Sequence, residues 1–300
     1  MNSAKDTVIT RCLSLADTAS ERAWSFHNST EALFWFRSVL KVDPQNTTAR
    51  LASARVYQYI ASQPWWHNNV SLAKGAASKA LAMLEEPFKP HNAVESSEKA
   101  LVCGQLYSAI AEPNVANKYL NEGITIDPGC SIGHYFLHFN NIFTDPRDDR
   151  ILSGLDKAVG LAEAEGSQRR LAAALYFRGF ANTLFSNYHE AIRDLKRSMA
   201  INPGYGSANL ALIAVAALAQ HKDTYKSVRC FKERYPNFTS DILDYMWVDR
   251  SSCSEYQRLV RPIVEVVKVK IGKQEMGKPR IRPPMPFRDS GGEHSPPRVP

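Results

Sequence analysis

The sequence lacks every arrangement of cysteine that would indicate a disulfide scaffold or a zinc site. Its five cysteines are odd in number, lie far apart and never form a Cys-x-x-Cys pair. Paired spacing is the usual sign of structural disulfides and of zinc knuckles. We therefore expect free thiols in a reducing compartment at Cys12, Cys103, Cys130, Cys230 and Cys253.

Long hydrophobic runs are also missing. A membrane-spanning helix needs about 20 consecutive apolar residues, and the most apolar stretch, residues 208–219, is shorter and rich in alanine. The amino terminus has no continuous apolar segment of the kind found in secretory signals. We expect a cytoplasmic protein without membrane association.

Motifs for catalysis and cofactor binding are absent. There is no Gly-x-Ser-x-Gly elbow, no Gly-x-x-x-x-Gly-Lys loop and no Gly-x-Gly-x-x-Gly loop. His134 and His138 are four residues apart, a spacing that metal ligands use, but no third ligand is indicated. The favoured interpretation is that the two histidines line a groove or pack against Tyr135 and Phe139. We expect no enzyme, no cofactor and no metal site.

Charge does not single out nucleic acid as a partner. The 300 residues carry a net charge of +7, spread along the chain, and no groove-reading motif is present. Hydrophobic residues make up 44% of the chain, enough for a sizeable core. A nucleic-acid partner therefore ranks behind a protein partner.

What the sequence does contain is a recurring stop signal for helices. Five amphipathic stretches close on an acidic or polar residue and then proline, at Pro44, Pro87, Pro128, Pro203 and Pro236. Proline lacks an amide hydrogen and disfavours helix in the residue before it. The intervals are 43, 41, 75 and 33 residues, and the interval of 75 fits two repeats if one unit has lost its proline. This punctuation predicts a tandem array of helical hairpins.

Small residues and leucines recur at matching places in two of these units. The residues are Gly104, Tyr107, Ala116, Leu120 and Pro128 in one unit and Gly179, Ala191, Leu195 and Pro203 in the other. Together they resemble a tetratricopeptide repeat (TPR) protein. The resemblance implies an all-α solenoid of paired helices, a TPR-like superhelix, in which the glycines allow close helix approach. It also implies an adaptor or scaffold whose concave face binds a protein segment.

The units also depart from the pattern of that family. Ala100 and Leu175 stand in place of its tryptophan. Arg178 replaces a usual leucine, and Asn182 replaces an aromatic residue. The unit at residues 131–165 has no terminal proline, and residues 64–69 form an insertion.

In its loose repeat, its insertion and the stretch 235–239, the chain is similar to the regulatory arrays found with bacterial class III adenylate cyclases and winged-helix transcription regulators. This second resemblance implies an alternative function. The chain would then be a stand-alone regulatory module of such a system.

Composition divides the chain into four parts. We expect an N-terminal arm (1–12), about six degenerate hairpins (13–236), a capping-helix region (237–272) and a disordered tail (273–300). The cap is predicted because apolar residues recur at helical spacing between 241 and 270, and the last face of an array needs cover. The basic, proline-rich tail contains a segment, 280–286, that fits the form of a polyproline-helix ligand, although such tails produce these matches by chance.

Aromatic residues gather in two successive units. They are Tyr135, Phe136, Phe139 and Phe143 in one unit and Tyr176, Phe177 and Phe180 in the next. For any single ring the core is the favoured location, but as a group they exceed what one helix seam needs. We therefore predict an aromatic-lined groove, centred on residues 135–184, that binds a peptide or a helix.

Two further features bear on binding. A basic clamp for a terminal carboxylate is not expected, because apolar residues stand where the family places lysine and asparagine: Leu101, Val102, Tyr176 and Phe177. In the insertion, Trp65 and Trp66 are adjacent, so both cannot point into one helix interface. Surface contact and a core plug remain equally open for this pair.

Overall fold

The regular structure is entirely helical in the residues that the computed structural model describes, which are 2–21, 26–64, 67–85, 89–221 and 224–273. The helices are α1 (Asn2–Glu21), α2 (Phe26–Val42), α3 (Thr47–Ser62), α4 (Val70–Glu85), α5 (Ala93–Ala109), α6 (Pro113–Ile126), α7 (Ser131–Thr144), α8 (Arg150–Ala164), α9 (Gln168–Leu184), α10 (Tyr188–Ile201), α11 (Gly206–Leu218), α12 (Thr224–Arg234), α13 (Asp241–Leu243) and α14 (Ser254–Lys273). A π-helix, η2 (Asp244–Val248), follows α13 directly.

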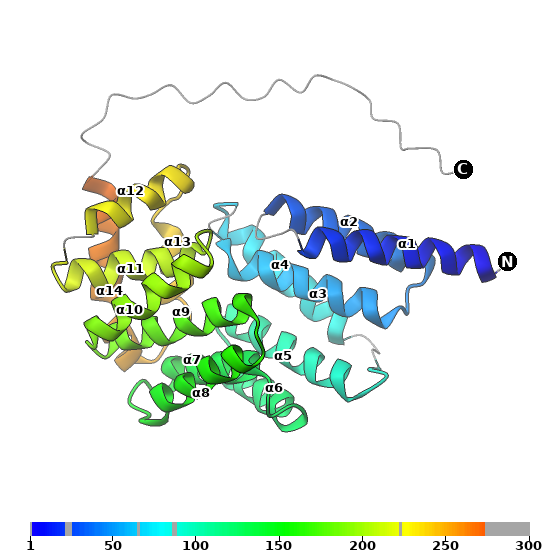
Figure 1. Ribbon diagram of the computed structural model, residues 1–300, viewed down its shortest axis with the longest axis horizontal. Helices are drawn as coiled ribbons and strands as arrows, with labels where there is room; N and C mark the ends of the chain where they lie inside the picture. The colour runs from blue at the N-terminus through cyan, green and yellow to red at the C-terminus, as the bar shows by residue number, and fades with distance from the viewer. Residues whose placement is uncertain (1, 22–25, 65–66, 86–88, 222–223, 274–300) are drawn as a thin grey trace, which may run out of the picture.

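Consecutive helices pair into six hairpins, from α1 with α2 to α11 with α12, and each hairpin packs on the next (Figure 1). The predicted all-α architecture of repeated helical hairpins is therefore confirmed. Since α1 begins at Asn2, the residues expected as an N-terminal arm belong instead to the first hairpin. Trp65, Trp66 and the tail beyond Lys273, including segment 280–286, lie outside the described residues.

The helices end where the proline signals predicted. Helices α2, α4, α6, α10 and α12 each stop two residues before one of the five prolines. Helix α8, in the unit without a terminal proline, ends differently. There Gly166 adopts a φ of 66° and its N–H donates to the Glu163 carbonyl oxygen at 3.1 Å. Glycine takes this left-handed conformation without the steric cost of a Cβ, so it closes the helix in place of proline.

Two hairpins are held at short range by a glycine beneath a leucine. A Cβ at Gly104 would lie 2.6 Å from Leu120 Cγ, and one at Gly179 would lie 2.7 Å from Leu195 Cγ. Real Cβ atoms do not approach other carbons so closely, so only glycine allows these helix pairs their spacing. Both leucines are fully buried. The two units thus share one packing geometry at equivalent positions.

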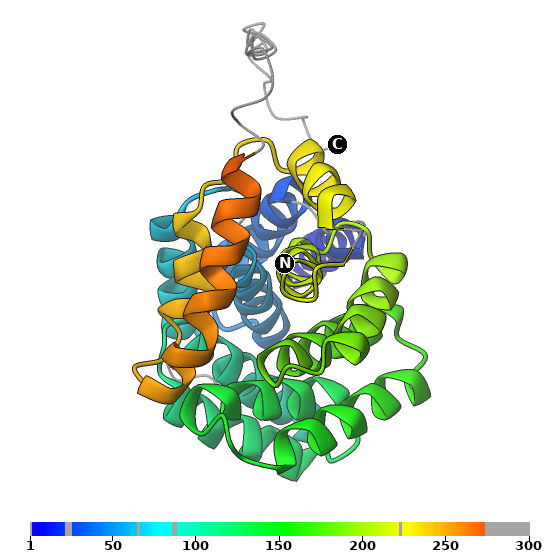
Figure 2. The ribbon, with the colours of Figure 1, turned by 90° about the vertical axis from the view of Figure 1, so that its left-hand side faces the viewer.

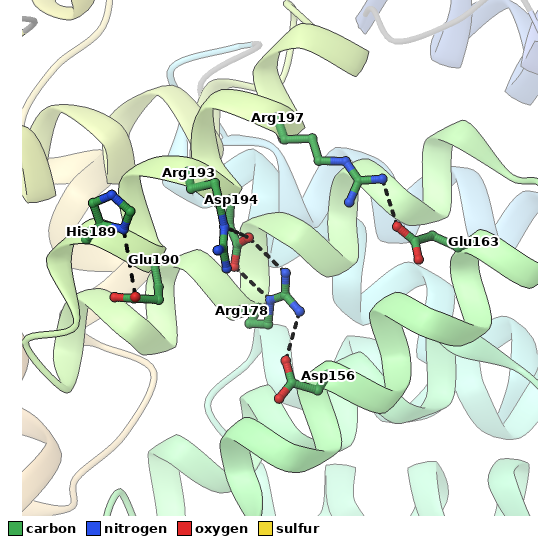
Figure 3. A network of polar contacts seen from close by, with 8 residues as sticks. All are labelled: Asp156, Glu163, Arg178, His189, Glu190, Arg193, Asp194 and Arg197. Atoms are coloured by element: carbon green, nitrogen blue, oxygen red, sulfur yellow. Dashed lines mark hydrogen bonds and ion pairs between the residues drawn. The ribbon is translucent and has the colours of Figure 1, made fainter.

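Arg178 occupies the position where the TPR pattern usually has leucine. Its side chain joins three helices through polar contacts (Figure 3). Its guanidinium donates to both carboxylate oxygens of Asp194 on α10, at 2.7 and 2.8 Å, and to Asp156 on α8 at 2.8 Å. The Asp194 side chain is only 2% exposed. The departure from the apolar pattern is therefore compensated by a buried, bidentate ion pair between neighbouring helices.

The C-terminal region covers the last hairpin, as the predicted cap required. Every residue of α11 from Gly206 to Ala216 is buried. A helix that is apolar on all sides needs partners on all sides. Helix α11 obtains them from α9, α10, α12 and α14, and Figure 2 shows it surrounded in this way.

We expect the glycine contact to be sensitive to any side chain. Gly104→Val should destabilise the fold by about 3 kcal/mol, because overpacking forces Leu120 and its helix to move. Gly160 on α8 is exposed, with nothing within 4 Å of its Cβ position, so Gly160→Val is the matched control. It should change stability by no more than about 0.5 kcal/mol. Urea unfolding measures both, and equal losses would show that helix propensity rather than packing is responsible.

We also expect Arg178→Met to destabilise the fold by about 3 kcal/mol, because it leaves the Asp194 carboxylate buried without its main partner. Arg197→Met is the control. Arg197 makes a 2.7 Å ion pair with Glu163, but both side chains are about half exposed. Such a surface pair contributes about 0–1 kcal/mol. If the two variants have the same urea midpoint, the buried pair contributes no more to stability than the surface pair does.

Candidate binding cavity on the concave face

The concave side of the array encloses a cavity of about 770 Å³. This volume lies within the range of about 300–1,000 Å³ that is typical of ligand pockets. Four helices turn one face each toward it, with lining residues that recur at about one helical turn. The lining includes Arg55, Gln58, Tyr59 and Gln63 from α3 and its end, Val94, Leu101, Val102 and Gln105 from α5, Tyr135, Phe136, Phe139 and Phe143 from α7, and Arg169, Arg170, Tyr176 and Phe177 from α9.

The structure brings six of the seven predicted aromatic residues to this one cavity. Tyr135, Phe136, Phe139 and Phe143 come from α7, and Tyr176 and Phe177 come from α9. Phe136 is half-buried, whereas the other five are less than 9% exposed. The seventh residue, Phe180, does not line the cavity; it is fully buried, with its ring centroid 5.1 Å from that of Trp247.

The six rings form a continuous wall centred on Phe177. The centroid of its ring lies 4.4 Å from Phe139, 5.0 Å from Phe136 and 5.1 Å from Tyr135. Offset and tilted pairs at these separations attract one another beyond simple burial. The wall is therefore a packed, apolar surface rather than a set of loose side chains.

The C-terminal segment forms part of the cavity lining next to the end of α5. The hydroxyl of Tyr245 donates to the carbonyl oxygen of Ala109 at 3.4 Å, and the guanidinium of Arg250 donates to that of Ser108 at 2.9 Å. Met246 and Arg250 join the lining. The sequence predicted a cap on the last hairpin but did not predict that this segment returns to the end of α5.

The two halves of the chain also meet across the concave side. Thr239 donates its N–H to the Asn68 side-chain oxygen at 3.0 Å, and the Lys74 ammonium lies 5.8 Å from the centre of the Tyr245 ring. The array is therefore curved so strongly that its C-terminal segment touches its second hairpin.

Helix α3 forms a polar wall opposite the aromatic one. The Arg169 guanidinium on α9 lies 4.2 Å from the centre of the Tyr59 ring, so these two walls are in direct contact at one point. Arg55 pairs with Glu98, and Arg170 pairs with Glu165 at 2.9 Å. Positive charge prevails in the lining, which contains four arginines and two acidic residues.

Gln58 brings an unsatisfied polar atom to this wall. The side chain is 3% exposed, and its amide oxygen has no hydrogen-bond donor among the described residues. Its orientation is fixed by a chain of contacts. The Gln58 amide nitrogen donates to the Ser62 hydroxyl at 3.3 Å, and that hydroxyl donates in turn to the Tyr59 carbonyl. A buried acceptor left without a donor costs about 1–3 kcal/mol, so it calls for an explanation.

The two histidines considered as metal ligands have structural contacts. Their rings stack with centroids 6.4 Å apart, and His134 hydrogen-bonds the Pro128 carbonyl at 3.0 Å. The His138 ring covers Gly154, where a Cβ would lie 2.1 Å from its Nε2 atom. Burial lowers the pKa of His138, and nearby His134 lowers it further. No cluster of three metal-binding side chains occurs within the described part of the chain.

Neither the α3 wall nor the contribution of the C-terminal segment to the lining was predicted from the sequence. The residues that were not predicted are Arg55, Gln58, Tyr59, Gln63, Arg169 and Arg250. Arg55, Tyr59 and Gln63 do recur every four residues, which indicates a shared helix face. Nothing local indicated that this face would lie opposite α9.

Two comparisons with known proteins found no match for this chain. No protein-family model matches it, and neither does any curated protein. Among the described helices, none has both the length and the apolar character needed to cross a membrane.

The buried tyrosines predict how stability depends on pH. Burial raises the pKa of Tyr135, Tyr176, Tyr205 and Tyr256 above 10. The unfolded chain ionises these groups near pH 10, while the folded chain keeps them neutral. Stability is therefore unaffected by them below pH 10 and falls as the pH rises above it, by up to about 1.4 kcal/mol per pH unit for each group.

Urea unfolding between pH 8 and 11.5 tests this expectation. Tyr135→Phe removes one of the ionising groups, so its stability should fall less steeply above pH 10 than that of the unsubstituted chain. Identical slopes in the two proteins would mean that Tyr135 ionises in the folded state as readily as in the unfolded state.

Proposed function

We propose that this protein is a non-enzymatic binding module, and that it holds a short segment of a partner protein in the cavity on its concave face. The observation that carries the proposal is the convergence of six aromatic residues from α7 and α9 on one cavity of ligand size. Aromatic side chains offer large, rigid contact surfaces at little entropic cost, and they dominate the energetics of many interfaces.

The shape of the cavity favours an extended segment as the occupant. A helix with its side chains is about 10–12 Å across. Met246 and Arg250 of the C-terminal segment line the cavity, and its walls meet where Arg169 lies 4.2 Å from the Tyr59 ring. A helix of several turns would have to displace these contacts, whereas an extended chain of a few residues would not.

The packing of the hairpins supports the resemblance to TPR proteins that the sequence suggested. Gly104 and Gly179 occupy equivalent places beneath Leu120 and Leu195, as paired helices of that family require. A scaffold or adaptor role in the cytoplasm forms part of the same proposal. Binding of a segment requires only the cavity itself and not membership of the family.

A random-sequence peptide display library tests this function directly. We expect the immobilised protein to enrich a consensus, and Phe136→Ala to weaken binding of the enriched peptide about 30-fold, equal to about 2 kcal/mol. Phe136 is the suitable target because it is half-buried, so its loss should leave the fold intact. Thermal unfolding followed by circular dichroism checks that point.

Tyr225→Ala is the matched control, because Tyr225 is an aromatic residue on α12 that is 67% exposed and does not line the cavity. It should bind the enriched peptide as the unsubstituted protein does. If no consensus is enriched, or if Phe136→Ala and Tyr225→Ala bind equally well, the cavity is not a peptide site.

A further inference from the structure

The side-chain oxygen of Gln58 is a hydrogen-bond acceptor that no described residue of the folded chain uses. Its amide nitrogen is engaged by Ser62, whose own hydroxyl is directed to the Tyr59 carbonyl. This arrangement leaves the Gln58 Oε1 atom as an acceptor, buried and without a donor among the described residues. Because Gln58 lines the cavity, a molecule held there is the natural source of the missing donor.

We propose that the Gln58 Oε1 atom accepts a hydrogen bond from a main-chain N–H group of the bound segment. This inference rests on the proposed peptide-binding function and names the contact by which the α3 wall would recognise a peptide. A peptide N–H that enters an aromatic cavity loses water and must find an acceptor. The two unsatisfied groups therefore complement each other.

The charge of the cavity favours a neutral donor over a cationic one. Its lining contains four arginines, Arg55, Arg169, Arg170 and Arg250, and two acidic residues, Glu98 and Asp127. Lysine or arginine side chains of a ligand would meet like charge there. A backbone N–H donates without carrying charge, so it suits this acceptor better.

The walls hold a peptide in the orientation that this contact needs. Gln58 precedes Tyr59, and the Tyr59 ring faces Arg169 of α9 at 4.2 Å. Phe177 and Tyr176 lie on the same helix as Arg169. A chain between α3 and α9 would therefore place side chains on the aromatic wall and main-chain groups toward Gln58.

A pair of small probes tests the contact even though the partner is unidentified. N-acetylphenylalanine N-methylamide carries an aromatic side chain and peptide N–H groups. Its analogue with both amide nitrogens methylated has no N–H donor. By NMR titration we expect the unsubstituted protein to bind the first probe about tenfold more tightly than the second.

Gln58→Met should reduce that preference to about twofold or less, because methionine keeps the length of the side chain but not the acceptor. Gln168→Met is the control, since Gln168 is exposed on α9 and does not line the cavity. It should keep the tenfold preference. A preference that survives Gln58→Met, or the absence of binding by either probe, overturns the proposal.

A measurement on the unsubstituted protein tests the same contact even if the Gln58→Met variant does not fold. The carbon resonance of the Gln58 side-chain carbonyl should shift with the N–H probe and not with the methylated one. A shift with neither probe, or the same shift with both, also overturns the proposal. In that case an enriched display peptide would still support peptide binding through the aromatic wall, so the two failures can be told apart.

Discussion

Trp247 is fully buried against Phe180, and around this contact the C-terminal segment is fixed inside the array. On one side Tyr245 and Arg250 hydrogen-bond to carbonyl oxygens at the end of α5. On the other, Tyr256 packs its ring 5.0 Å from that of Phe143 on α7. The hairpins cannot spread apart without exposing this large aromatic surface to water. The curvature of the array, and with it the size of the cavity, therefore depends on this set of contacts, of which the buried Trp247 is the largest side chain.

Closure gives the concave face two unlike walls. The wall from α7 and α9 is aromatic, with five of its six rings buried, whereas the wall from α3 carries buried polar groups such as the Gln58 amide. An unsatisfied acceptor beside a packed aromatic surface is unfavourable for the empty protein but suits a peptide, which brings both side chains and N–H groups. The unsatisfied acceptor thus lowers the stability of the empty protein at the same place where a bound peptide can supply the missing hydrogen bond.

The helix ends and the packing of two hairpins could be predicted because both are decided locally. Proline stops a helix wherever it falls, and a glycine that faces a leucine of the partner helix permits close approach. The backbone conformation also repeats at turns whose residue types differ from one hairpin to the next. Ala111, Ser186 and Gln220 all adopt a positive φ at equivalent turns between paired helices, although they share no side-chain chemistry. Such a turn is invisible to a search for residue types, because the hairpin geometry imposes it on whichever residue is present.

Patterns along the chain were enough to predict an array of helical hairpins, the ends of five of its helices, and the surplus of aromatic residues on α7 and α9. Long-range packing, by contrast, directs Phe177 to the cavity and Phe180 to Trp247, and places Gln58 and Tyr59 on the opposite wall. The two kinds of feature differ in how far apart along the chain the interacting residues lie. Helix ends and apolar faces follow from neighbours along the chain, whereas the contact between Arg169 and Tyr59 depends on small rotations summed over several hairpins, which no local pattern records.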